Sequence, residues 1–156
     1  MIISGIHYPF SSVGVFRYNP HRKGEIKKQK DFQLVLNIDN NIREYYHSWL
    51  IRNYGIKSEI MLPNFTTAHI TVIKGNEFLL NFKESLTFLQ SFEKKKCKFY
   101  YSGDIQEIEY IDSETKTKRS FFTIPAYAKE FVDIRNKVVG HEQKSYPFHV
   151  TIGRKF

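Results

Sequence analysis

The sequence contains a single cysteine, Cys97, which excludes an internal disulfide and a metal site built from several cysteines. A lone cysteine of this kind is more typical of a small core residue than of a reactive thiol. No apolar stretch is long enough to cross a bilayer, and residues 1–10 lack the basic and apolar segments of a signal peptide. We therefore expect a cytoplasmic protein with no membrane partner. No cluster of His, Cys, Asp and Glu has metal-site spacing, so no metal or other cofactor is expected.

Acidic residues are in deficit, with 16 Asp and Glu against 24 Lys and Arg, so the formal net charge is +8. Part of the basic excess is concentrated in residues 21–30, 93–98 and 116–119. Each of these segments alone is typical of a solvated loop or helix end. Together they create a positive field that attracts phosphate-bearing ligands. An anionic partner is therefore expected rather than a neutral or cationic one.

Hydrophobic periodicity predicts one α+β domain over residues 1–156, with strands and helices alternating after a less regular start. Residues 1–30 are expected to form two short strands around a turn, followed by a basic segment of uncertain role. The later expected strands are 31–39, the segment around His69, 97–103, 105–111, 119–124 and the segment around His149. The expected helices are 40–54 with its apolar stripe Ile42, Tyr45, Tyr46, Trp49 and Leu50, then 76–96 with a lysine-rich end, and 125–139 opening on Pro125.

Two short segments carry the same pattern 80 residues apart, HITV from His69 and HVTI from His149. On a strand, His69 and Thr71 lie on one face and Ile70 and Val72 on the other, and the second segment repeats the arrangement. A single histidine of this kind is usually half-buried and hydrogen-bonded to a neighbour. Each motif also ends the same succession of strand, amphipathic helix and histidine strand. Two copies of one unit favour an approximate two-fold axis that brings both histidines to one cleft.

The paired motifs resemble those of the two-histidine (2H) phosphoesterases, the LigT-like superfamily. HVTIGR, with its arginine, is a close match to the family's second motif, and HITVIKG is a fair match to the first. The resemblance covers about residues 31–156. It implies a bilobal fold with pseudo-two-fold symmetry, in which antiparallel sheets form a central cleft and helices pack outside. It also implies that His69 and His149 are the acid/base pair and that Thr71 and Thr151 hold the phosphate, without metal.

The chemistry of the four residues is consistent with this role. In-line cleavage of a phosphodiester needs a base on the attacking oxygen and an acid on the leaving oxygen. Two imidazoles supply both near neutral pH, because histidine titrates there. A threonine hydroxyl on the same face can donate to a non-bridging phosphate oxygen as charge develops. The sequence does not indicate which histidine is the base.

Three further residues near the motifs are weaker candidates for substrate binding: Tyr146, Lys74 and Arg154. Tyr146 stands just before the second motif and could stack on a base, although a core or turn position is the commoner one for tyrosine. Lys74 and Arg154 fall off the His/Thr face if their strands stay regular, and pairing with a carboxylate is the alternative for both. His7, His21, His47 and His141 lack the motif and are expected at the surface or in turns.

Two functions remain open at this level. The first is a metal-independent phosphodiesterase acting on a cyclic nucleotide, a 2′-5′ oligonucleotide or a 2′,3′-cyclic phosphate, with RNA as a further substrate. The sequence is rich in Lys, Ile, Asn, Phe and Tyr and poor in alanine, a composition typical of an AT-rich genome. Together with the small size, this composition suggests a phage member that degrades a host immune nucleotide signal in the host cytoplasm. A monomer is favoured. The alternative is a non-catalytic RNA- or nucleotide-binding module that uses basic clusters and exposed aromatics. This alternative leaves the duplicated motif unexplained.

Overall fold

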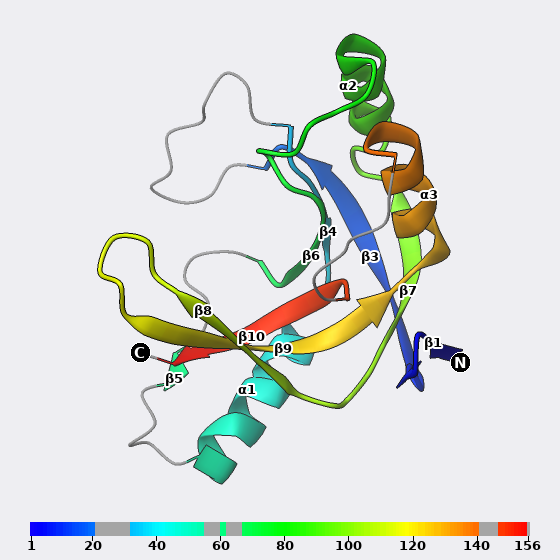
Figure 1. The fold of residues 1–156 in the computed structure, drawn as a ribbon. Helices are drawn as coiled ribbons and strands as arrows, with labels where there is room; N and C mark the ends of the chain where they lie inside the picture. Colours follow the sequence, from blue (N-terminus) through cyan, green and yellow to red (C-terminus); the bar gives the residue numbers. More distant parts are fainter. Residues whose placement is uncertain (21–31, 55–59, 62–66, 141–146, 156) are drawn as a thin grey trace.

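The computed structural model describes residues 1–20, 32–54, 60–61, 67–140 and 147–155, and Figure 1 shows an α+β protein. All strand pairings in this described part of the chain are antiparallel, as expected for an α+β fold. The strands are β1 Ile2–Ile3, β2 Ile6–His7, β3 Phe10–Tyr18, β4 Leu34–Asn37, β5 Ile60–Met61, β6 His69–Ile73, β7 Lys96–Tyr101, β8 Gln106–Ile111, β9 Lys118–Tyr127 and β10 His149–Lys155. The helices are α1 Asn40–Tyr54, α2 Phe82–Gln90 and α3 Lys129–Val138.

One continuous eight-stranded sheet forms the body of the protein, in the order β5-β10-β6-β4-β3-β7-β9-β8. Strand β9 also pairs with β10, so the strands from β10 round to β9 form a closed circuit. Two junctions in this circuit are short: Val150 opposite Ile70, and Tyr100 and Tyr101 opposite Tyr127 and Ala126. Longer ladders hold β4, β3 and β7 together on one side, and β8, β9 and β10 on the other. The separate sheets expected from the sequence are thus joined into one.

The N-terminal strand β3 is central to this sheet, although the family resemblance left the first thirty residues outside. It pairs with β4 on one edge and with β7 on the other. Gly14 shows how close the approach is, because a Cβ there would lie 2.6 Å from the backbone oxygen of Asn37. Phe16, two residues later, is buried in the core. The expectation of two short strands around a turn missed the length and position of β3.

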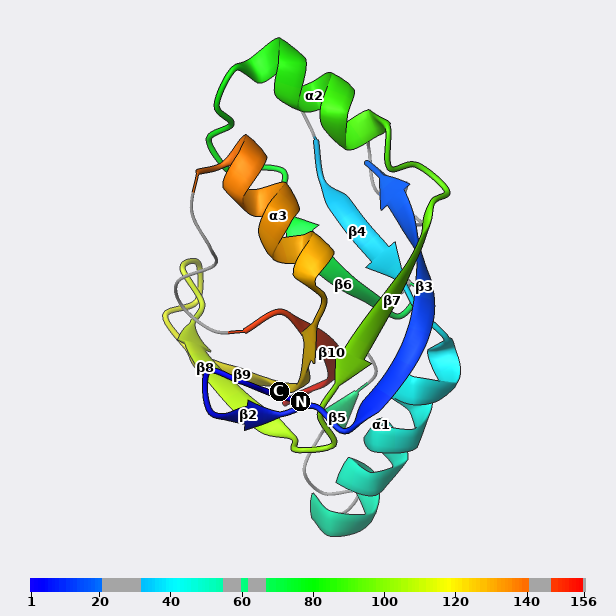
Figure 2. The same cartoon turned by 90° about the vertical axis from the view of Figure 1, so that its right-hand side faces the viewer.

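The helices pack crosswise on the two histidine strands. Helix α1 follows β4 and precedes β6, yet it packs on β10, and α3 precedes β10 yet packs on β6. Figures 1 and 2 show α1 beside β9 and β10, and α2 and α3 together beside the other half of the sheet. The ammonium group of Lys137 on α3 lies 4.0 Å from the centre of the Phe88 ring on α2, which joins these two helices.

Two helix predictions are wrong in their boundaries. Pro125 does not open a helix: it lies in β9 opposite His149, and α3 begins at Lys129. Pairing of this segment with β10 overrides the local preference of proline for a helix start, and proline's missing N–H is tolerated at this ladder position. Helix α2 ends at Gln90, so the lysines after it occupy a turn and the start of β7 rather than a helix end.

The core confirms several expected burial patterns. In the strand expected over 31–39, the alternating residues Phe32, Leu34, Leu36 and Ile38 are buried, and Val35 on the opposite face is buried as well. Cys97 is also buried, which confirms a small core residue, and burial is the main cause that raises the pKa of its thiol to about 12. Within α1, Leu50 is buried, but Tyr45 and Trp49 are exposed, so the expected stripe is only partly a core face. His47 is half-buried, not a surface residue, because the packing of α1 covers part of it.

Candidate functional site

The two motif strands lie side by side, which brings the four predicted catalytic residues together. Strands β6 and β10 pair antiparallel with Val150 opposite Ile70, and both of these side chains are fully buried. The residues that flank them must therefore face away from the core. Antiparallel pairing about this point sets His149 beside Thr71, and Thr151 beside His69. All four are half-buried, so each histidine lies next to the threonine of the other strand.

The two units also share one register against their neighbouring strands. On β6, His69, Ile70 and Thr71 lie opposite Asn37, Leu36 and Val35 of β4. On β10, His149, Val150 and Thr151 lie opposite Pro125, Ile124 and Thr123 of β9. We call β4, α1 and β6 the first unit, and β9, α3 and β10 the second unit. Their registers correspond residue by residue, which is consistent with the internal repeat inferred from the sequence.

A β-bulge follows each His-x-Thr motif at the same position. The register steps from Thr71 to Ile73 against β4 and from Thr151 to Gly153 against β9, so Val72 and Ile152 are extra residues. An extra residue shifts the alternation of faces by one. Val72 and Ile73 are accordingly both buried, as are Ile152 and Gly153.

The bulges change the predicted place of Lys74 and Arg154. The strands are not regular, and after one extra residue these positions return to the His/Thr face. The positive charge of Lys74 lowers the pKa of His149, which agrees with a position of Lys74 on this face. Arg154 lies opposite Phe121 in the β9–β10 register, and the Phe121 ring lies 6.1 Å from that of His149, which agrees with a position of Arg154 on the same face. Each motif therefore extends to His-x-Thr-x-x-Lys/Arg, with a cation five residues after the histidine.

Buried Arg135 of α3 holds the first bulge, and the sequence analysis did not identify it. Its Nη1 donates to the carbonyl oxygen of Val72 at 2.8 Å and to Glu77 Oε2 at 3.0 Å, while Nη2 donates to Glu77 Oε1 at 2.6 Å. Glu77 also accepts from the backbone N–H of Lys74 at 2.8 Å. Although burial raises the pKa of Glu77, hydrogen bonds from Arg135 and Lys74 and their positive charges outweigh it and lower that pKa. The bulge is thus fixed by a charge-assisted network.

Both imidazoles are oriented by the same backbone contact. The Nδ1 atom of His69 lies 2.8 Å from the carbonyl oxygen of Thr67, and Nδ1 of His149 lies 3.0 Å from that of Pro147. A carbonyl can only accept, so Nδ1–H is the donor in each case. Nε2 is then the nitrogen left in each ring to take up or release a proton. The two rings therefore use equivalent atoms for proton exchange.

The surroundings of His149 disfavour its protonated form. Burial is the main cause that lowers the pKa of His149, and the charges of Lys74 and His69 lower it further. The hydrogen bond to Pro147 opposes this shift without reversing it. The net effect favours the neutral form of the His149 imidazole. The effect of His69 on this pKa also agrees with the strand register in placing the two rings close together.

Two aromatic residues extend the His/Thr face along β9 and β8. The Phe121 ring lies 6.1 Å from that of His149, and the Tyr110 ring lies 5.7 Å from that of Phe121. Phe121 is half-buried, and Tyr110 is exposed. Alternation along β9 could have placed Phe121 on the same face as Thr123. Phe121 lies near His149 because of the β9–β10 register, which the local sequence does not predict.

The remaining predicted features are only partly described. Tyr146, His21, His141 and the basic segment 21–30 lie outside the described residues. His7 is exposed, as expected. In segment 116–119, Lys118 pairs with Glu109 at 3.0 Å and Arg119 with Asp112 at 3.4 Å, so this segment is partly neutralised. The lysines of segment 93–98 are exposed, as a solvated surface would be.

The site thus combines two imidazoles, two hydroxyls and two cations, which can move two protons while holding an anion between them. Within the described ranges, no three His, Cys, Asp or Glu side chains are grouped so that they could hold a metal ion. Among the helices described, none has the length and apolar content needed to span a membrane. Comparison with protein-family models, curated proteins and solved structures finds no match to this chain.

Proposed function

We propose that the protein is a metal-independent phosphodiesterase that cleaves a nucleotide phosphodiester by two-histidine general acid/base catalysis. One observation carries the proposal: the strand register sets each motif histidine beside the threonine of the other motif, with both Nδ1 atoms held by backbone carbonyls. The proposal includes the bilobal fold of the two-histidine phosphoesterases. The shared register and the shared bulge of the two units support it.

The lowered pKa of His149 makes it the base in this proposal, and His69 is the acid. Nε2 of His149 takes the proton of the attacking oxygen, from water or a neighbouring ribose hydroxyl, as the new P–O bond forms. Nε2 of His69 gives its proton to the leaving oxygen as the old P–O bond breaks. Each proton transfer contributes about 10²- to 10⁴-fold. The products are a phosphate ester and a free hydroxyl.

The other residues on this face bind and orient the substrate. The Thr71 and Thr151 hydroxyls donate to non-bridging phosphate oxygens, and Lys74 and Arg154 supply the countercharge. Phe121 offers a ring face beside His149 on which a nucleobase can stack. The substrate class is a cyclic nucleotide, a 2′-5′ oligonucleotide or a 2′,3′-cyclic phosphate, including a nucleotide signal of host immunity.

The test is turnover in EDTA on a panel of these substrates. Wild type is compared with His69→Ala and His149→Ala, and with His7→Ala, an exposed histidine on β2, as the matched control. We expect cleavage that survives EDTA, falls about 10²- to 10⁴-fold in each motif variant and is unchanged in the control. Loss of activity in EDTA would contradict the metal-independent mechanism. Nucleotide binding without turnover of any substrate would favour the binding module instead.

A further inference from the structure

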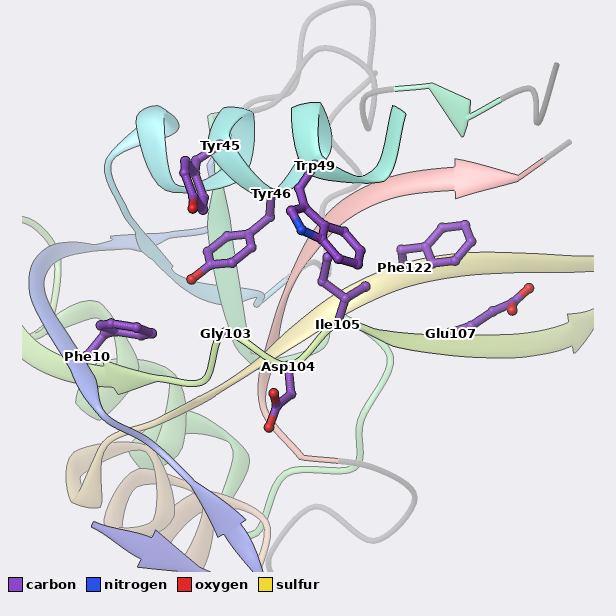
Figure 3. Close-up of a pocket in the computed structure, with 9 residues that line it drawn as sticks. All are labelled: Phe10, Tyr45, Tyr46, Trp49, Gly103, Asp104, Ile105, Glu107 and Phe122. Carbon is purple, nitrogen blue, oxygen red and sulfur yellow. The ribbon is translucent and has the colours of Figure 1, made fainter. Parts of the chain in front are cut away.

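A separate pocket lies on the opposite side of β9 from the histidines. It has a volume of about 450 Å³ and lies between α1 and the segment that leads from β7 into β8 (Figure 3). Phe122 contributes to its wall, whereas Phe121, the next residue on the strand, faces His149. Neighbouring residues of a strand point to opposite faces, so the two sites are separated by the sheet itself. A pocket of this volume is in the usual range for a small-molecule site.

Large aromatic side chains line this pocket and are unusually exposed. Tyr45 is 62% exposed, Trp49 is 42% exposed and Phe10 is 45% exposed. Figure 3 shows Tyr46 and Trp49 pointing from α1 toward residues 103–105, with Phe10 at one end. Exposing this much aromatic surface has a cost in water, and contiguous exposed apolar surface commonly marks a binding site. The exposed part of the predicted α1 stripe is therefore this pocket wall.

The wall is closely fitted at Gly103. A Cβ atom at this position would lie 3.2 Å from the Tyr46 hydroxyl oxygen and 3.3 Å from Cε2 of Phe10. A side chain at this position would push the two rings back by a few tenths of an ångström, so glycine favours this close approach. Tyr45 and Tyr46 meet edge to face, with ring centres 5.0 Å apart and planes at 89°. The Tyr46 ring thus packs against Tyr45 on one side and lies next to Gly103 on the other.

The charge of the pocket is opposite to that of the protein. Asp104 and Glu107 line it, and none of the described residues in its wall is Lys, Arg or His, although the chain carries a net charge of +8. Ser120 donates to Glu107 Oε1 at 2.7 Å and so positions that carboxylate. Aromatic ring faces carry negative electrostatic potential. The carboxylates and the aromatic ring faces both disfavour a phosphate group and favour a positively charged ligand.

We propose that this pocket binds a free small organic cation that carries an alkylammonium or quaternary ammonium group. The cation would lie against the faces of Tyr45, Tyr46 and Trp49, where it gains cation–π attraction, and near the Asp104 carboxylate. This arrangement of aromatic rings and carboxylates is the usual chemistry for recognising quaternary ammonium groups. The proposal does not depend on the phosphodiesterase activity, because it uses none of the residues of the histidine site.

Trp49 is the only tryptophan, so its indole N–H gives a single reporter signal from inside the pocket. Choline is titrated against 3,3-dimethylbutan-1-ol, a neutral molecule of the same shape, while this signal and the tryptophan fluorescence are followed. We expect saturable binding of choline and at least about tenfold weaker binding of the neutral analogue, the size of one good cation–π contact. His149→Ala should bind choline as wild type does, whatever it does to turnover.

Variants test the assignment of the pocket residues. Asp104→Asn removes one charge and should weaken choline binding several-fold, and Tyr45→Ala should weaken it by about tenfold. Both side chains are exposed, so folding should be retained. Glu114→Gln, in the turn between β8 and β9, is the matched charge control and should change nothing. Equal binding of the neutral analogue, preference for adenosine or for a lysine peptide, or no saturation up to about 10 mM would each overturn the proposal.

Discussion

The first and second units share the same strand register and the same bulge after the His-x-Thr motif, but different residues surround them. In the first unit, Arg135 and Glu77 fix the bulge after Thr71 from outside the sheet. In the second unit, the bulge after Thr151 is followed by Gly153, and the ring of Phe121 lies near His149. Burial and two nearby charges lower the pKa of His149. The surroundings of an imidazole, and not the motif alone, can therefore decide which proton-transfer role it takes.

The largest expected effect is a division of labour between the histidines. His69→Ala and His149→Ala should each reduce turnover by about 10²- to 10⁴-fold on a natural phosphodiester. A p-nitrophenyl leaving group needs no acid, so it should restore much of the activity of His69→Ala and little of that of His149→Ala. Steady-state rates on both substrates provide the measurement. Rescue of His149→Ala alone would reverse the assignment of acid and base.

The second effect concerns the stability of the first unit. Arg135→Met should lower the free energy of unfolding by about 3 kcal/mol, because it leaves the partly buried Glu77 carboxylate and the Val72 carbonyl without their donor. Urea denaturation measures the change. The matched control is Arg17→Met, whose pair with Glu93 is exposed and should contribute at most about 1 kcal/mol. Equal losses in both variants would mean that the buried network has no special role in holding the bulge.

A third, smaller effect should fall on substrate binding in the second unit. Phe121→Ala should raise KM by about tenfold with little change in kcat, since stacking of one base contributes about 1–3 kcal/mol. Tyr110→Ala, one ring further from His149, should have a smaller effect. Comparing nucleotide substrates with a nitrophenyl phosphodiester checks the cause. A KM increase of the same size on both substrate types would indicate general damage rather than lost stacking.

The smallest effect is a shift in the pH profile. Activity should rise with pH as His149 loses its proton and fall at higher pH as His69 loses its own, which gives a bell-shaped curve. Lys74 lowers the pKa of His149, so Lys74→Gln should raise that pKa and move the acid limb to higher pH. Arg154→Gln is the control from the equivalent position of the second unit. The measurement is the pH profile of kcat/KM for each variant. A shift of the acid limb in Arg154→Gln but not in Lys74→Gln would contradict the assigned effect of Lys74 on His149.

Local patterns in the sequence were sufficient to predict most elements of the fold. Alternation identified β4, β7, β8 and both histidine strands, and helical spacing identified α1. The order of elements also indicated two related units. The prediction failed where a distant segment decides the local state, as at Pro125, which pairs with β10 instead of starting a helix. The preference of proline for the start of a helix is weaker than the pairing of this segment with β10.

The candidate site was predicted in part. Alternation placed the histidine and threonine of each motif on one strand face, and the duplicated motif with its family resemblance singled out His69, His149, Thr71 and Thr151. The structure brings these four residues together. The bulges could not be predicted from the sequence, because two consecutive apolar residues such as Val72 and Ile73 are equally typical of a strand that is buried on both faces. Lys74 and Arg154 were expected off the His/Thr face only for regular strands, and the bulges remove that condition. Arg135 was missed because an arginine in a helix is typically a surface residue.

The crosswise packing of the helices makes the two units interdependent in folding. Helix α1 packs on β10 and α3 packs on β6, so each helix is buried against the histidine strand of the other unit. Central strand β3 also pairs with β7, far along the chain, and β10 supplies pairing to both β6 and β9. Such long-range connections make folding slow but strongly cooperative. A chain cut between β6 and α2 should yield two fragments that fold only when they associate, and the site would then assemble as the two pieces recombine.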